Sequence, residues 1–66
     1  MTVRVSDTYY IWVNGHRPKG RGHWAFQIGG DFPVATVWFR GTYAEAKRAA
    51  VKAAKEHKVD FIKVMP

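Results

Sequence analysis

The sequence predicts one α+β domain in which a small antiparallel sheet packs against a single C-terminal helix. Two stretches of large apolar residues with a period of two, residues 23–28 and 35–40, are typical of strands. An alanine- and lysine-rich stretch with helical periodicity follows them. We therefore expect the order β-β-β-α-β, with residues 1–66 forming a single domain.

The composition is that of a small, basic, globular protein. Hydrophobic residues make up 47% of the 66 residues and aromatic residues 15%, so the chain can form a core. The absence of cysteine excludes disulfides and zinc–thiolate sites. Eleven Lys and Arg residues against five Asp and Glu residues give a formal charge of +6. This charge favours an anionic partner, such as nucleic acid, an acidic protein surface or an anionic membrane.

The distribution of apolar residues argues against a membrane protein. No apolar stretch reaches the roughly 20 residues that a membrane helix needs, and the first residues lack the apolar run of a signal peptide. We expect no membrane partner and a cytoplasmic location, either with the nucleoid or in the cytoplasm of a host.

The N-terminal third is expected to supply an edge segment, the first strand and a loop. Residues Met1–Asp7 alternate weakly, which predicts either a short edge strand or a loose arm. Tyr9–Asn14 is predicted to be the first strand because its residues are mostly β-branched or aromatic, and Asn14-Gly15 ends it. Residues 15–22 contain three cations, three glycines and a proline, which predicts a mobile basic loop without an anchor in the core.

The next two strands are predicted to form a hairpin. His23–Ile28 alternates large apolar side chains with smaller or polar ones. Gly29–Pro33 has the composition of a turn, and Ala35–Arg40 returns as the third strand. The side chains expected to face the helix from this hairpin are Trp24, Phe26, Ile28, Val37 and Phe39.

The helix is predicted to begin at about Tyr43. Thr42 and Glu45 have the spacing of a capping box, in which the Thr hydroxyl accepts from the Glu amide and the Glu carboxylate accepts from the Thr amide. After the helix, Phe61–Met65 alternates again and is predicted to be a short fourth strand. The buried stripe of the helix is expected to contain Ala46, Ala49, Ala50, Ala53 and Ala54, continued by His57.

One helix covers one face of a sheet, so the other face is expected to stay open with the basic loop at its rim. Aromatic side chains exposed beside polar groups are typical of a binding surface. The competing interpretation is that the N-terminal arm, or a second copy of the chain in a homodimer, covers Trp12 and Trp38. The side chains expected on the open face are Tyr10, Trp12, Asn14, Gln27, Thr36, Trp38 and Arg40, with Ile11 and Val13 on the core side.

Catalysis is not indicated. The three histidines, His16, His23 and His57, have no cysteine, second histidine or carboxylate cluster near them in the sequence. Metal ions such as zinc need three or four convergent ligands, and no pair of carboxylates has the spacing for acid–base chemistry. We therefore expect no enzyme activity, no metal and no cofactor, with His16 and His23 as surface groups or phosphate contacts.

Nucleic acid is the favoured partner. Lys and Arg side chains neutralise phosphates, while Arg40, Gln27 and Asn14 carry groups that can read base edges in the major groove. Tyr10, Trp12 and Trp38 could instead stack on unpaired bases, which would indicate single strands. The lysines of the helix are interpreted as a solvated face. We predict double-stranded DNA as the target.

Three runs, Gly22–Ile28, Val37–Tyr43 and Ala46–Ala50, resemble AP2/ERF-type domains and the arm-binding domains of phage integrases. The resemblance implies a DNA-binding protein of a phage or mobile element, with a three-stranded sheet that reads the major groove. It also implies that Gln27, Trp38, Arg40 and Thr42 contact the groove and that Arg17, Lys19 and Arg21 lie near the phosphates.

A protein partner is the alternative. Small proteins with this order of elements are common among phage-encoded inhibitors, which bind a host defence or transcription protein. The two functions make different demands on the sequence. DNA binding requires Arg17, Lys19 and Arg21, whereas a protein interface would depend more on Trp12 and Trp38.

Overall fold

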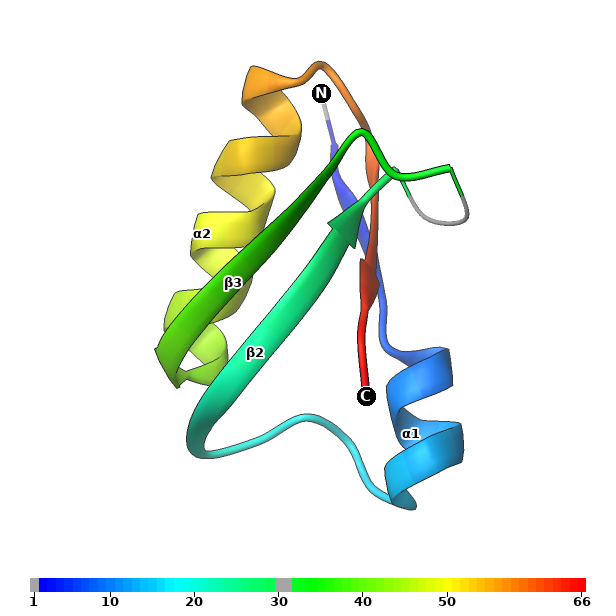
Figure 1. Ribbon diagram of the computed structural model, residues 1–66, viewed down its shortest axis with the longest axis vertical. Helices are drawn as coiled ribbons and strands as arrows, with labels where there is room; N and C mark the ends of the chain where they lie inside the picture. Colours follow the sequence, from blue (N-terminus) through cyan, green and yellow to red (C-terminus); the bar gives the residue numbers. More distant parts are fainter. Residues whose placement is uncertain (1, 30–31) are drawn as a thin grey trace.

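The computed structural model describes residues 2–29 and 32–66. Over these residues the chain forms one four-stranded sheet and two helices, which confirms the α+β class and the fourth strand (Figure 1). The elements in chain order are β1 (Arg4–Ser6), α1 (Thr8–Asn14), β2 (Arg21–Ile28), β3 (Ala35–Thr42), α2 (Tyr43–Glu56) and β4 (Phe61–Val64).

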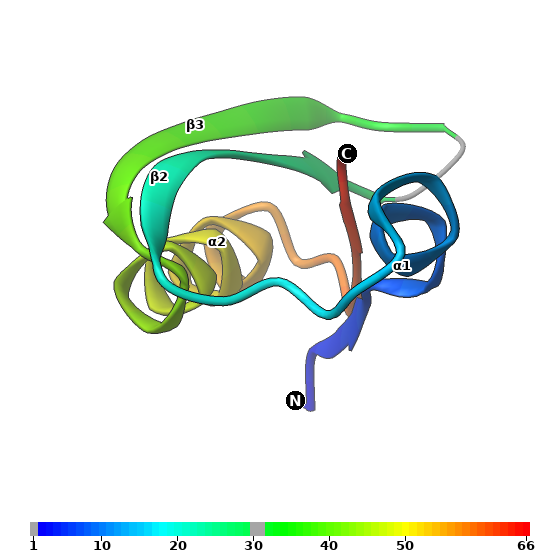
Figure 2. The ribbon, with the colours of Figure 1, turned by 90° about the horizontal axis from the view of Figure 1, so that it is seen from below.

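The sheet has the strand order β1-β4-β2-β3. β2 is antiparallel to both of its neighbours, whereas β1 and β4 run parallel. Viewed from the end, the sheet curves around α2, and α1 lies against the opposite face near β4 (Figure 2). The sheet therefore has an inner face, packed on α2, and an outer face that α2 leaves uncovered.

The core lies between the sheet and α2. Trp24, Phe26 and Ile28 of β2 are buried, as their period of two predicts, and Val37 and Phe39 pack against the same cluster. The indole Nε1 of Trp24 donates a hydrogen bond to the Gly41 carbonyl at 2.9 Å, so its polar atom is satisfied. The other buried side chains are Ile62 and Val64 of β4 and Ala46, Ala50 and Ala54 of α2.

The alanine stripe is confirmed at every fourth residue, and its small side chains let α2 approach a sheet of large ones. Ala49 and Ala53 are only half-buried at the border of the stripe. The expected continuation at His57 is wrong, because His57 is exposed and forms the C-cap of α2. Lys58 then takes a left-handed conformation, with φ of 58°, which ends the helix.

The capping box at the start of α2 is confirmed. The amide of Glu45 donates to Thr42 Oγ1 at 3.2 Å, and the amide of Thr42 donates to Glu45 Oε1 at 3.4 Å. The Thr42 hydroxyl also donates to Glu45 Oε1 at 2.8 Å. These contacts set the first residue of α2 at Tyr43, as predicted.

The hairpin of β2 and β3 is also confirmed, with a register that runs from Ile28 opposite Ala35 to Arg21 opposite Thr42. Gly29 has φ of 101°, and a Cβ atom there would lie 3.0 Å from the Phe32 carbonyl oxygen, so this end of the predicted turn needs glycine. Residues 30 and 31 of the turn lie outside the described residues.

The strand predicted over Tyr9–Asn14 is wrong, because these residues belong to helix α1. Strand propensity amounts to no more than about 1 kcal/mol per residue, and tertiary packing overrides it. Tyr10 points to the core rather than to the open face, with its ring centroid 5.9 Å from that of Trp24. Val13, expected in the core, is 52% exposed. Gly15, with φ of 76°, ends the helix by donating to the Ile11 carbonyl at 2.7 Å.

Two further segments of the N-terminal region differ from a simple β-β-β-α-β order. Of the two predictions for the first seven residues, the edge strand is the one observed, and β1 pairs in parallel with β4.

The connection between α1 and β2 is anchored, contrary to expectation. Pro18 is buried, and the Gly20 carbonyl accepts a hydrogen bond from the Tyr43 amide at 2.9 Å. The C-terminal end of this connection is thereby held at the start of α2.

Candidate functional site

The outer face of the sheet is the candidate site. Because the alternate residues of β2 and β4 are buried against α2, their neighbours in the sequence point outward. The register aligns these side chains across the strands in rows. The outward residues of the four strands are Arg4, Ser6, His23, Ala25, Gln27, Thr36, Trp38, Arg40, Phe61 and Lys63, with Met65 just beyond β4.

One end of the outer face is basic. Arg40 on β3 lies directly opposite His23 on β2, and Arg21 begins β2. The three side chains and two glycines line a hollow of about 350 Å³. Arg17 and Lys19, both exposed, lie in the anchored connection just before Arg21. Of the sequence-predicted cations, the structure therefore brings Arg21 and Arg40 together at this hollow, with His23 between them.

Glu45 is the acidic neighbour of this basic end. Its pKa is lowered by the hydrogen bonds from the Thr42 hydroxyl and amide, and further by the charges of Arg21 and Arg48. Its carboxylate is therefore ionised at neutral pH and committed to the cap. The hollow beside Arg40 is itself lined by Arg, His and Gly residues.

The middle of the outer face combines an amide with an exposed indole. Gln27 is half-buried between Thr36 of β3 and Lys63 of β4. Trp38 is 77% exposed opposite Ala25, and it shares a shallow hollow of about 200 Å³ with Arg40 and His23. The predicted exposure of Trp38, Thr36 and Arg40 is confirmed.

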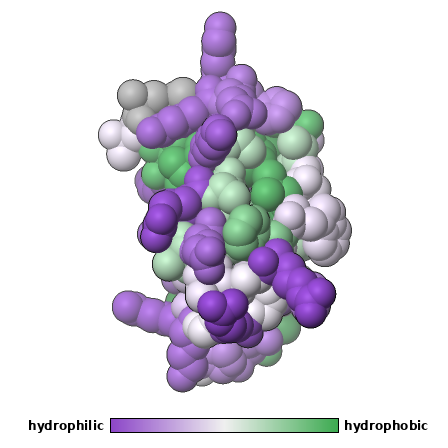
Figure 3. Space-filling model, turned by 90° about the vertical axis from the view of Figure 1, so that its left-hand side faces the viewer, coloured by the Kyte–Doolittle hydropathy of each residue, from purple (hydrophilic) through white to green (hydrophobic). Residues whose placement is uncertain are grey.

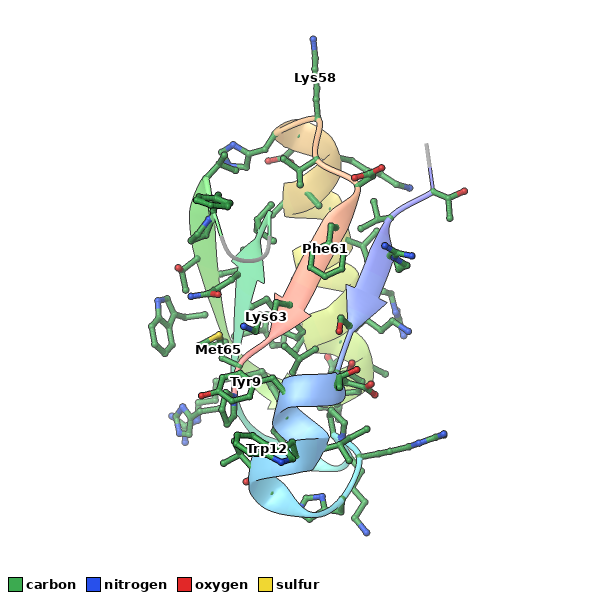
Figure 4. The ribbon with its side chains drawn as sticks, turned by 90° about the vertical axis from the view of Figure 1, so that its right-hand side faces the viewer. Tyr9, Trp12, Lys58, Phe61, Lys63 and Met65 are labelled. Atoms are coloured by element: carbon green, nitrogen blue, oxygen red, sulfur yellow. The ribbon has the colours of Figure 1, made fainter. Side chains whose placement is uncertain are left out.

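The other end of the outer face is an aromatic hollow of about 390 Å³ between α1 and β4. Its residues project from both elements toward the same space (Figure 4). The rings of Tyr9 and Trp12 lie nearly parallel, with centroids 6.2 Å apart and an angle of 29° between their planes. The lining residues are Ser6, Thr8, Tyr9, Trp12, Phe61 and Lys63.

Three predicted site residues have other roles or positions. Asn14 ends α1, and its side-chain amide donates to the Tyr10 carbonyl at 3.1 Å. Thr42 uses its hydroxyl within the capping box. Tyr10 packs between Trp24 and the His16 ring, 5.9 Å from each ring centroid. The exposed aromatic surface of α1 therefore consists of Tyr9 and Trp12.

Sequence reasoning missed Tyr9, Phe61 and Lys63 as surface residues. The outward position of Phe61 and Lys63 could have been read from their alternation with the apolar Ile62 and Val64. Tyr9 could not be assigned, because its direction depends on α1 being a helix. The spacing of Tyr9 and Trp12, three residues apart, brings their rings together only in a helix.

Over residues 2–29 and 32–66, no group of three His, Asp or Glu side chains converges on a common point where a metal ion could be held. His16 lies beside the Arg17 carbonyl, with its Nδ1 at 2.9 Å, and His23 belongs to the basic end. Nor does either helix of the described ranges have the length and apolarity to cross a bilayer.

The cations of α2 lie on the other side of the molecule. Viewed from the side of α2 and β3, hydrophilic side chains project around a paler, partly hydrophobic surface (Figure 3). Lys47, Lys52 and Lys55 are all exposed on this helix, which fits the predicted solvated face. They provide matched controls for any test of the outer face.

No family model, no curated protein and no solved structure matches this chain. The likeness to AP2/ERF-type and integrase arm-binding domains therefore stays a prediction. The function proposed below is argued from the outer face itself.

Proposed function

We propose that this protein binds nucleic acid, and double-stranded DNA in particular, through the outer face of its sheet. The observation that carries the proposal is the basic end, where Arg40 lies opposite His23 and next to Arg21 on paired strands. Cations grouped on one face neutralise several phosphates and release their counterions, which supplies affinity. The net charge of +6 attracts the anionic partner from a distance.

The β2–β3 ribbon has a suitable shape for a duplex. A two-stranded antiparallel ribbon fits the major groove, which is about 12 Å wide. β3 forms the edge of the sheet and carries Thr36, Trp38 and Arg40 on its outer side. The ribbon can therefore enter a major groove with these side chains facing the base pairs.

Base reading is assigned to two side chains of the ribbon. The guanidinium of Arg40 can donate two hydrogen bonds to a guanine edge, and the amide of Gln27 can pair with an adenine edge. Arg40 is exposed, whereas Gln27 is half-buried in the row between Thr36 and Lys63. We therefore expect Arg40 to contribute more to sequence preference than Gln27.

The test is a mobility shift with a generic duplex, repeated over a range of salt concentrations. Arg40→Ala and Arg21→Ala are expected to weaken binding. The slope of log K against log salt is negative, and each lost phosphate contact reduces its magnitude by about 0.9. Lys52→Ala removes the same charge from the exposed side of α2 and is the matched control. It is expected to leave the slope unchanged.

Failure would be clear. The proposal is lost if the duplex does not bind at low salt. It is also lost if Lys52→Ala weakens binding as much as Arg40→Ala, because the effect would then come from net charge rather than from the outer face.

A protein partner is the second candidate, and a different observation favours it. Trp12 and Trp38 are 81% and 77% exposed, and tryptophan and arginine are the usual anchors of protein interfaces. On this alternative the chain acts as a phage-encoded inhibitor of a host protein. Its binding would then depend on Trp38 and Trp12, would tolerate Arg17→Ala and Lys19→Ala, and would depend little on salt.

A further inference from the structure

We infer that the aromatic hollow between α1 and β4 takes an unpaired nucleobase, so that the protein binds single-stranded nucleic acid at this end. The inference rests on the proposed function, since it names the form of nucleic acid that the α1 end of the outer face receives. It concerns Tyr9, Trp12 and Phe61, which the β2–β3 ribbon does not include.

The ring arrangement favours a planar ligand. Tyr9 and Trp12 stand nearly parallel, and Trp12 is 81% exposed, so most of its indole surface is accessible. Phe61 lines the same hollow from β4 (Figure 4). Every nucleobase has a π-face that stacks on such rings regardless of sequence. The volume of about 390 Å³ lies near the lower end of the roughly 300–1,000 Å³ typical of small-molecule sites, which suits a planar ring.

The charges around the hollow complement a nucleotide. The Nζ of Lys63 lies 4.7 Å from the centroid of the Tyr9 ring, and the Cζ of Arg4 lies 5.7 Å from that of Phe61. All six lining residues are neutral or cationic. The rings of Tyr9 and Phe61 therefore each have a cation beside them, and these cations would attract the phosphates of a strand whose base stacks in the hollow.

The fold holds this arrangement in place. Tyr10, the neighbour of Tyr9, is fixed against Trp24 and the core. Gly15 closes α1 at its other end through the hydrogen bond to Ile11. Because α1 is anchored by Tyr10, the rings of Tyr9 and Trp12 are presented without further folding, which lowers the entropic cost of binding.

The test compares two labelled probes by fluorescence anisotropy at one salt concentration. The first is an oligothymidylate of about ten nucleotides, a length within the site sizes of small single-strand binders. The second is a blunt duplex of mixed sequence. Trp12→Ala is expected to weaken binding of the single strand by roughly 5- to 140-fold, the loss typical of one stacked base, and to leave duplex binding nearly unchanged.

Two control variants distinguish the loss of base stacking from structural damage to α1. Trp12→Phe keeps an aromatic ring and is expected to restore most of the single-strand affinity. Val13→Ala shortens an exposed side chain next to Trp12 on α1 but outside the hollow, and is expected to have no effect. A loss with Val13→Ala as large as that with Trp12→Ala would overturn the inference, because it would report damage to α1.

Other outcomes separate this inference from the proposed function. If Arg40→Ala weakens duplex binding but Trp12→Ala leaves single-strand affinity unchanged, the inference is overturned and the proposed function still stands. No binding of either probe would overturn both. Competition by thymidine monophosphate as strong as that by the strand would assign the hollow to a free nucleotide instead. A dimer in sedimentation that Trp12→Ala dissociates would assign it to a second copy of the chain.

Discussion

The two faces of the sheet use the same residue type for opposite purposes. Trp24, on β2, is 5% exposed and donates its indole hydrogen to the Gly41 carbonyl. Trp38, on the neighbouring strand, is 77% exposed on the outer face. The difference arises because the two residues point to opposite faces of the sheet and α2 covers only one of them. The side chains that form the core and those left exposed for the proposed binding are therefore separate residues of the same strands.

This separation extends to charge. The buried core contains no polar or charged residue among those described, whereas cations border both hollows at the ends of the outer face. Substitutions on the inner face should therefore change the free energy of unfolding, and those on the outer face should change binding alone. The following predictions test that division.

The largest effect is expected for Phe26→Ala. Phe26 is fully buried, so the substitution should lower the free energy of unfolding by about 3–5 kcal/mol. Trp38→Ala removes a larger ring from the outer face and should change it by less than about 0.5 kcal/mol. Urea denaturation followed by circular dichroism measures both. Equal losses would mean that Trp38 is buried in solution, and that inner-face and outer-face residues do not differ in their effect on stability.

Ala50→Leu should cost about 1–3 kcal/mol, because a larger side chain forces α2 away from the sheet. Ala50 is fully buried. Ala44→Leu, the same change at an exposed position of the same helix, is the control and should be nearly neutral. Thermal unfolding of the two variants gives the comparison. If Ala50→Leu unfolds at the same temperature as Ala44→Leu, then α2 and the sheet are not closely packed at Ala50.

Thr42→Ala should cost about 1 kcal/mol through loss of the N-cap. The variant should also change how steeply the melting temperature falls as the pH becomes acidic. The folded state lowers the pKa of Glu45 below 4.5, so this group stabilises the fold above its unfolded pKa and loses that contribution as pH falls through the folded pKa. Melting temperatures measured from neutral to acidic pH should fall less steeply in Thr42→Ala. Parallel curves for the two proteins would contradict the link between the cap and Glu45.

The smallest effect is expected at alkaline pH. Burial, and to a lesser degree the charge of Asp7, raise the pKa of Tyr43 above 10.0. The neutral phenol is therefore favoured in the folded state. Its contribution to the free energy of unfolding is complete below the pKa of Tyr43 in the unfolded chain and is lost as pH rises through its pKa in the folded protein.

Tyr43→Phe should consequently reduce the decline of the melting temperature above pH 10.0. Melting temperatures of Tyr43→Phe and of the parent protein, measured from neutral to alkaline pH, give the comparison. The idea is rejected if the two curves are parallel.

Much of the fold could be predicted because it depends on neighbours in the sequence. The capping box of Thr42 and Glu45 links residues three positions apart, and the period of two in β2 assigns Trp24 and Phe26 to one face. The helical spacing of Ala46, Ala50 and Ala54 identifies the inner side of α2 in the same way. Of the candidate site, the outward positions of Trp38 and Arg40 followed from the same alternation.

The rest required contacts between distant residues. Residues 8–14 have the composition of a strand, yet they form α1 because Tyr10 packs against Trp24 and Gly15 caps the helix. A seven-residue helix is too short to be stable alone, so only tertiary packing selects it. The resulting geometry also decided which aromatic residues are exposed together.

By itself, then, the sequence determined the hairpin, the start and buried stripe of α2, and the fourth strand, because each depends on local spacing and side-chain chemistry. Only the tertiary structure decided that β4 lies between β1 and β2, that the first apolar run is a helix, and that this helix stands on the outer face. Strand order and helix placement depend on burial shared between segments far apart in the chain. The aromatic hollow of Tyr9, Trp12 and Phe61 is a product of that long-range packing.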